Sequence, residues 1–97
     1  MPPFTRDLVA GVERNRSDLD RLLVRHVRGW TIERMAVVDR NVLRLAAFEL
    51  LHRPDVPPAA AISEAVEAAK ALSTEKSGRF VNGILGAIAR QAAAEQS

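Results

Sequence analysis

The fold is decided by residues 36–52, which read AVVDRNVLRLAAFELLH. On a helical wheel of 3.6 residues per turn, the apolar residues of this segment cover most of the circumference instead of forming one stripe. A helix that is apolar nearly all round is buried on several sides, as the central helix of a bundle is. We therefore predict that residues 36–52 form a helix that other helices surround.

The segments on both sides of this helix also have helical patterns, with short breaks at glycine and proline. Apolar residues do not alternate with period two anywhere in the chain, so we expect an all-α fold. A tight turn or a single helical turn is expected at residues 30–35, and a frayed tail at residues 91–97. The predicted helices span residues 5–15, 17–29, 36–52 and 58–72, and a last helix follows an N-cap at Ser77.

Length and composition indicate one small globular domain over residues 1–97. The chain is 47% hydrophobic and 27% charged, and it contains no apolar run long enough to cross a membrane. Its first residues, MPPFTRD, do not resemble a signal peptide. The absence of cysteine excludes disulfides and thiolate metal sites. We therefore expect a cytoplasmic protein.

The charge permits binding of nucleic acid without arguing for it. The formal net charge is only +2, and most of the basic residues are arginines, with lysine at positions 70 and 76 alone. Arginine suits bidentate contacts to phosphate or carboxylate. The same bias is also explained by codon usage in a GC-rich genome.

Catalytic and metal-binding constellations are not found. The two histidines, His26 and His52, lie on different predicted helices, and neither has a second ligand at metal-site spacing. Gly83 and Gly86 fall inside a predicted helix, where they would let a neighbouring backbone approach, and not in a phosphate-binding loop. We predict that the chain is not an enzyme and that it needs no metal or cofactor.

Charged residues within the central helix need partners. An unpaired charge in a protein interior is costly, so we expect Arg44 to form an ion pair with an acid such as Glu64 on the next helix. Two interpretations stay open for Asp39 and Arg40. They form either a structural ion pair or a polar strip offered to a partner.

Residues 76–80, KSGRF, open the last predicted helix. Lys76 and Arg79 supply two cations, the helix start supplies free backbone N–H groups, and Phe80 supplies an aromatic ring. These groups together could bind a phosphate and an unstacked base. The alternative is that Phe80 is simply part of the core.

Several of these segments carry a family resemblance. The chain resembles the NusB family of transcription antitermination factors over about residues 4–90, and most of all its actinobacterial members. The matching stretches are LVAGV (8–12), GW (29–30), DRNVLRLA (39–46), FELL (48–51), DVP (55–57), AISEAVE (61–67) and RFVNGIL (79–85).

The resemblance implies an all-helical bundle that binds the boxA element of nascent ribosomal RNA. It does so with NusE, a ribosomal small-subunit protein, and the complex joins other Nus factors on RNA polymerase to suppress premature termination. The positions that match Lys76, Arg79 and Phe80 lie on the RNA-facing side of the family fold. Those that match Glu33 and Asp39 lie toward NusE, and we include the neighbouring Arg40 in that contact.

The chain departs from the family pattern at its beginning. Family members usually begin with about two further helices, the first rich in arginine, so this chain is N-terminally truncated relative to the family. We expect the apolar faces left exposed either to mediate self-association or to receive helices from another polypeptide.

Two alternative functions remain. One is an RNA-docking domain related to the NusB-like domain of ribosomal RNA cytosine methyltransferases, although those domains tend to read NAVLR where this chain has NGILG at residues 82–86. The other is a NusE-docking fragment that has lost RNA binding.

Overall fold

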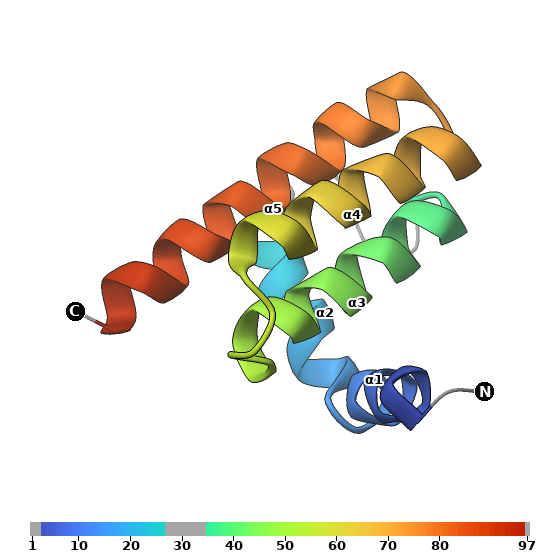
Figure 1. The fold of residues 1–97 in the computed structure, drawn as a ribbon. Coiled ribbons are helices and arrows are strands. Elements are labelled where there is room, and N and C mark those ends of the chain that lie inside the picture. The colour runs from blue at the N-terminus through green and yellow to red at the C-terminus, as the bar shows by residue number, and fades with distance from the viewer. Residues whose placement is uncertain (1–2, 27–34, 97) are drawn as a thin grey trace.

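The computed structural model of the chain describes residues 3–26 and 35–96. These residues form helices and no strand, which confirms the predicted all-α class (Figure 1). The five helices of the described part are α1 (Pro3–Arg14), α2 (Arg16–His26), α3 (Val37–His52), α4 (Pro58–Leu72) and α5 (Glu75–Gln96).

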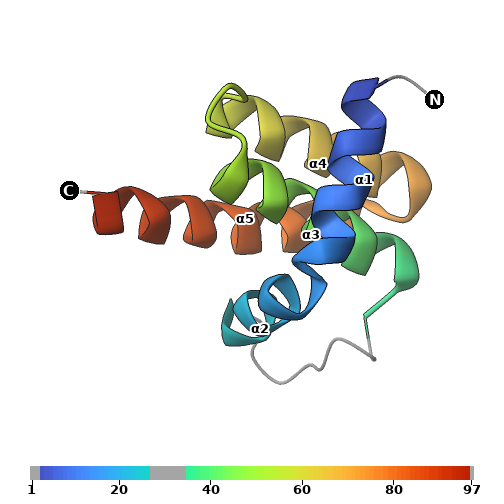
Figure 2. The same ribbon diagram turned by 90° about the horizontal axis from the view of Figure 1, so that it is seen from below.

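Helix α3 is the centre of the bundle. It packs against each of the other four helices, as its all-round apolar sequence predicts. Helices α4 and α5 form an antiparallel hairpin beside it, and α1 crosses α3 on the opposite side (Figures 1 and 2). Helix α2 contacts both α3 and α5, so it closes the bundle at one side.

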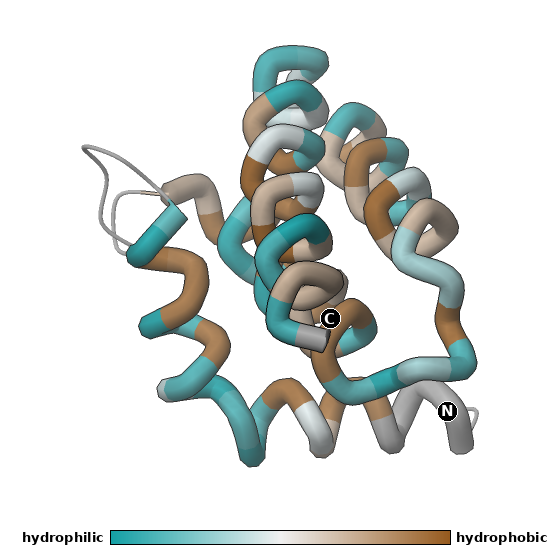
Figure 3. Tube along the Cα trace, turned by 90° about the vertical axis from the view of Figure 1, so that its left-hand side faces the viewer, coloured by the Kyte–Doolittle hydropathy of each residue, from teal (hydrophilic) through white to brown (hydrophobic). Residues whose placement is uncertain are grey.

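The core consists mainly of aliphatic side chains, together with Met35 and Phe48. Hydrophobic and hydrophilic residues follow one another along the helices (Figure 3). Helix α4 contributes alanines, at positions 61, 65 and 69, each one turn from the next. Helices α4 and α5 share the most extensive contact between two helices of the described part. The largest fully buried side chains are Leu19, Leu23, Leu43, Val81, Leu85 and Ile88.

A glycine is required where α1 crosses α3. A Cβ at Gly11 would lie 2.2 Å from Cζ of Phe48, so only glycine lets the two helices approach this closely. The close approach predicted at Gly83 and Gly86 is wrong for the described residues. No described atom lies within 4 Å of a Cβ built at Gly83, and Gly86 faces only the guanidinium of Arg90.

The start of α5 also differs from the prediction. Helix α5 begins at Glu75, and the backbone N–H of Ser77 donates to Oγ1 of Thr74 over 3.0 Å. Thr74 is therefore the capping residue, and Ser77 is the third residue of the helix. The helix then continues to Gln96, through residues for which the sequence predicts a frayed tail.

Two further observations bear on the predictions. The turn expected at residues 30–35 and the end of the second predicted helix fall largely on residues 27–34, outside the described residues. Within the described part, none of the helices combines the length and the apolar character needed to cross a membrane.

Candidate functional site

The middle of α3 carries a buried arginine, Arg44, in an ion pair with the half-buried Asp20. Nε of Arg44 donates to Oδ1 of Asp20 over 2.6 Å, and Nη2 donates to Oδ2 over 2.8 Å. These hydrogen bonds raise the pKa of Arg44 above its usual value. The predicted pairing with Glu64 is wrong, because the partner of Arg44 is on α2 and not on α4. This pair fixes α2 against α3.

The first turn of α3 carries a second buried charge, Asp39. Its side chain is 7% exposed, and its Oδ2 accepts a hydrogen bond from Oγ of Ser77 over 3.0 Å. Its Oδ1 is buried and accepts no hydrogen bond from any described residue. Oγ of Ser77 also lies 3.0 Å from Oγ of Ser73 and 3.2 Å from Oγ1 of Thr74. This polar cluster joins the beginning of α3 to the turn between α4 and α5.

A hollow of about 350 Å³ lies against this cluster, between the start of α3 and the start of α5. We call it the α3–α5 hollow. Its buried lining residues, such as Asp39 and Ser77, lie on its inner side, while Lys76 is exposed to solvent. The hollow is lined by Met35, Ala36, Asp39, Thr74, Lys76, Ser77 and Phe80.

Two of the three residues predicted to bind RNA line this hollow. Lys76 and Phe80 are four residues apart on α5, so both lie on the same face of the helix. Phe80 is half-buried and packs against the core, so the two interpretations of its role, core residue and surface ring, are compatible. Arg79 is exposed on the same turn but does not line the hollow.

Sequence reasoning missed one further cation, Lys70. A Cβ at Gly78 would lie 2.6 Å from Cγ of Lys70, so the aliphatic part of Lys70 covers the first turn of α5. Its Nζ lies 4.0 Å from a carboxylate oxygen of Glu67 and 4.0 Å from one of Glu75. No signal in the sequence relates Lys70 to Gly78, because that contact depends on how α4 and α5 pack.

The residues predicted to contact a protein partner separate in the structure. Asp39 lines the α3–α5 hollow together with Lys76 and Phe80. Arg40 is half-buried on α3 and does not line the hollow. Glu33 lies outside the described residues.

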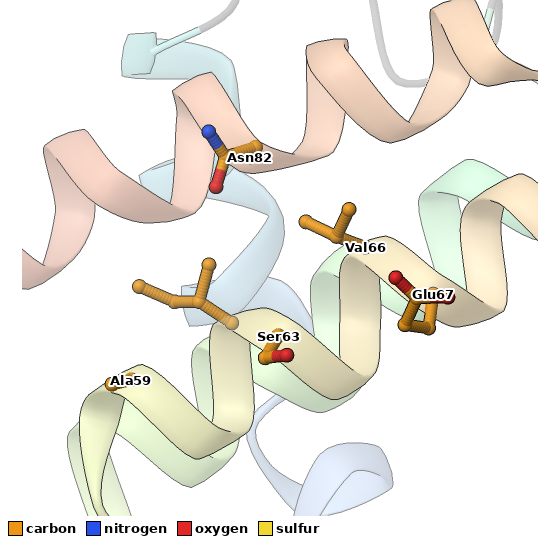
Figure 4. Close-up of a pocket in the computed structure, with 6 residues that line it drawn as sticks. Ala59, Ser63, Val66, Glu67 and Asn82 are labelled. Carbon is orange, nitrogen blue, oxygen red and sulfur yellow. The ribbon is translucent and has the colours of Figure 1, made fainter.

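A second hollow, of about 370 Å³, lies between α4 and α5 (Figure 4). It contains none of the predicted site residues. Half-buried Ile62 and Val66 give it an apolar surface, and Asn82 faces them from α5. The lining residues are Ala59, Ile62, Ser63, Val66, Glu67 and Asn82.

The histidines have structural contacts. Nδ1 of His26 lies 3.0 Å from the backbone oxygen of Leu22, and the ring of His52 packs on Phe48 with centroids 5.1 Å apart. The described residues contain no group of three or more His, Cys, Asp or Glu side chains that could hold a metal ion.

The α3–α5 hollow offers a cation, Lys76, and an aromatic ring, Phe80. This combination is suited to binding an anion together with a planar group.

The fold and this site define an all-α domain of five described helices with a cationic and aromatic hollow at the start of its last helix. The sequence profile of the NusB family matches residues 1–90, so the chain belongs to the NusB family. It is 60% identical over 93 residues to the transcription antitermination protein NusB of Saccharopolyspora erythraea, in agreement with the resemblance to actinobacterial members. That match covers 92% of this chain.

Solved structures support the fold. T. maritima NusB superposes with a TM-score of 0.85 at 49% identity, over 88% of this chain and 60% of that one. A chain in the crystal structure of a plectonemic RNA supercoil also gives a TM-score of 0.85, at 35% identity, over 95% of this chain and 66% of that one. The NusB-like five-helix bundle is thus confirmed, and a family of antitermination proteins agrees with the prediction of a non-enzyme.

The chain is shorter than its relatives. It spans 63% of the length of the Saccharopolyspora protein and 60% of the T. maritima chain.

Proposed function

We propose that the chain is an RNA-binding transcription antitermination factor of the cytoplasm. With NusE it binds boxA of nascent ribosomal RNA and suppresses premature termination by RNA polymerase. Family membership supports this proposal, and so does the likeness to a chain found in a structure with RNA. The observation that carries it is the α3–α5 hollow, where Lys76 and Phe80 lie on one face with Arg79 exposed on the same turn.

The aromatic ring and the two cations have different tasks in the proposed complex. Single-stranded RNA presents unstacked bases, and aromatic rings bind them by stacking. Phe80 supplies that ring, and its packing against the core keeps the ring in place. Lys76 and Arg79 bind the neighbouring phosphates, because both cations are exposed beside the ring. No step of this function is catalytic.

The protein partner contacts a different part of the surface. We propose that NusE docks on the side of α3 that carries Arg40, with Glu33 in the same contact. The resemblance also assigns Asp39 to that contact, although its 7% exposure leaves it little surface to offer to a protein. Other Nus factors and RNA polymerase join through the NusE complex.

A titration of fluorescently labelled boxA RNA tests the proposed function. The chain is titrated with and without NusE, and a scrambled RNA of the same composition is the control. We expect binding that depends on sequence and that NusE strengthens. Phe80→Ala should weaken it by about 1–3 kcal/mol, because a base loses its stacking surface. Equal affinity for boxA and scrambled RNA, with no effect of Phe80→Ala, would contradict the proposal.

The second candidate function is protein docking without RNA binding. It is favoured by apolar side chains that α3 leaves exposed, Val37 at 60%, Leu45 at 38% and Leu51 at 43%. Such a surface is typical of one that another polypeptide or a second copy covers. Binding to NusE in the absence of any RNA affinity would favour this candidate. Sedimentation as a monomer, together with a sharp thermal transition, would count against self-association.

A further inference from the structure

We propose that Asp39 is a positioning residue for RNA binding. Through its hydrogen bond to Ser77 it holds the first turn of α5, and with it Lys76 and Phe80, in the geometry that the RNA needs. This inference rests on the proposed function and assigns to it a residue that lies on another helix.

The hydrogen bonds of Ser77 transmit the position of α3 to α5. Its Oγ donates to Oδ2 of Asp39 over 3.0 Å, so α5 is attached to a residue 38 positions earlier in the chain. Its backbone N–H donates to Oγ1 of Thr74 over 3.0 Å, which fixes the start of the helix. Ser77 directly follows Lys76 and precedes Phe80 by three residues, so all three lie within about one helical turn. A shift of Ser77 therefore shifts both groups that line the hollow.

The incomplete bonding of Asp39 indicates that stability alone does not explain its presence. Among the residues that the structure describes, none donates a hydrogen bond to the buried Oδ1, and an unpaired buried acceptor lowers the stability of the fold. An apolar side chain of similar size would avoid that cost. What it would lose is the directional bond to Ser77, which an apolar group cannot replace.

A direct role of the carboxylate in binding RNA fits the structure less well. Asp39 is only 7% exposed, and the oxygen that has no partner is the one that is covered. Its negative charge would also repel a phosphate held by Lys76. Asp39 therefore acts through Ser77, and its effect should appear in RNA affinity and not in affinity for the protein partner.

The test uses the variants Asp39→Ala and Ser77→Ala, alone and combined. Labelled boxA RNA is titrated with saturating NusE, and NusE affinity is measured separately without RNA. Each single variant should bind RNA about three- to tenfold more weakly, the effect of losing one hydrogen bond. The double variant should bind no more weakly than the weaker single variant, because both remove the same bond. NusE affinity should not change.

Matched controls are available on α2. Ser17 and Asp18 are exposed, and within the described residues neither forms a hydrogen bond to α5, so Ser17→Ala and Asp18→Ala should leave RNA affinity unchanged. Asp39→Asn is the control for loss of folding, because its amide oxygen can still accept the hydrogen bond from Ser77 and so keep the local structure. This variant should bind RNA at least as tightly as the wild type, since it keeps the bond and removes a negative charge.

The possible failures can be told apart. If the wild type binds no RNA, the proposed function is overturned and this inference falls with it. If the wild type binds and Asp39→Ala and Ser77→Ala bind equally well, this inference alone is overturned. Additive losses in the double variant, or an Asp39→Asn variant as weak as Asp39→Ala, would overturn it too.

Discussion

Two of the buried charges of helix α3, Asp39 and Arg44, lie five positions apart, and their surroundings differ. Arg44, in the middle of the helix, donates from one edge of its guanidinium, Nε and Nη2, to both carboxylate oxygens of Asp20. Asp39, in the first turn, accepts a hydrogen bond from Ser77 at one oxygen, and its other oxygen has no partner among the described residues. The Arg44 pair is bidentate and joins two helices, whereas the Asp39 contact uses one oxygen and borders the α3–α5 hollow. We infer that the middle of α3 serves stability and that its beginning serves binding.

The largest effect should follow from breaking the bidentate ion pair between Arg44 and Asp20. Arg44→Ala removes a buried guanidinium and both of its hydrogen bonds to the half-buried Asp20, so the free energy of unfolding should fall by about 3 kcal/mol. Urea denaturation measures this loss. Arg21→Ala is the matched control, because it removes an exposed ion pair with Asp18 and should change stability little. Equal stability of the two variants would contradict a stabilising role for the middle of α3.

Alanine substitutions at Gly11 and Gly83 should have smaller effects on stability, of opposite sign. Gly11→Ala forces a Cβ against the ring of Phe48, so we expect a loss of about 1–3 kcal/mol. Gly83→Ala meets no described atom within 4 Å and should stabilise α5 by up to about 1 kcal/mol. Thermal unfolding of both variants gives the two signs. A loss of stability in Gly83→Ala would show that another surface covers this position.

The smallest effect should come from a third buried charge of α3, Glu49. Burial raises its pKa, and the nearby Glu64 raises it further. A carboxylate with a raised pKa in the folded state adds stability below its ordinary pKa, and that stability is lost as pH rises through the folded value. Glu49→Gln should therefore be more stable than the wild type at pH 7, by a fraction of a kcal/mol. The difference should vanish near about pH 4. A constant difference across this range of pH would argue against titration of Glu49.

The sequence was sufficient for those features that depend on local pattern. The all-round apolar surface of residues 36–52 predicted the central helix. The residue types at 76–80 indicated a site of cations and an aromatic ring, and Lys76 and Phe80 of that segment line one hollow. The partner of Arg44 was not predictable, because Asp20 is 24 positions away and an acid near a helix start has an ordinary local explanation.

The cap of α5 and the contact between Asp39 and Ser77 could not be predicted from the sequence either. Residues 73–77 contain three hydroxyl side chains, and each of them could cap a helix, so local sequence could not single out Thr74. The contact between Asp39 and Ser77 joins residues 38 positions apart. It arises from the packing of α3 against α5, which no spacing rule encodes.

The salt dependence of RNA binding tests the central claim most directly, because it counts phosphate contacts. The affinity for boxA RNA with NusE is measured over a range of salt concentrations for the wild type, for Lys76→Ala combined with Arg79→Ala, and for Arg90→Ala. Arg90 is an exposed cation of the same helix, about three turns further on. We predict that the slope of log affinity against log salt becomes shallower by about 1.4 in the double variant and stays unchanged in Arg90→Ala. A double variant that binds with the wild-type slope would contradict an RNA site at the start of α5.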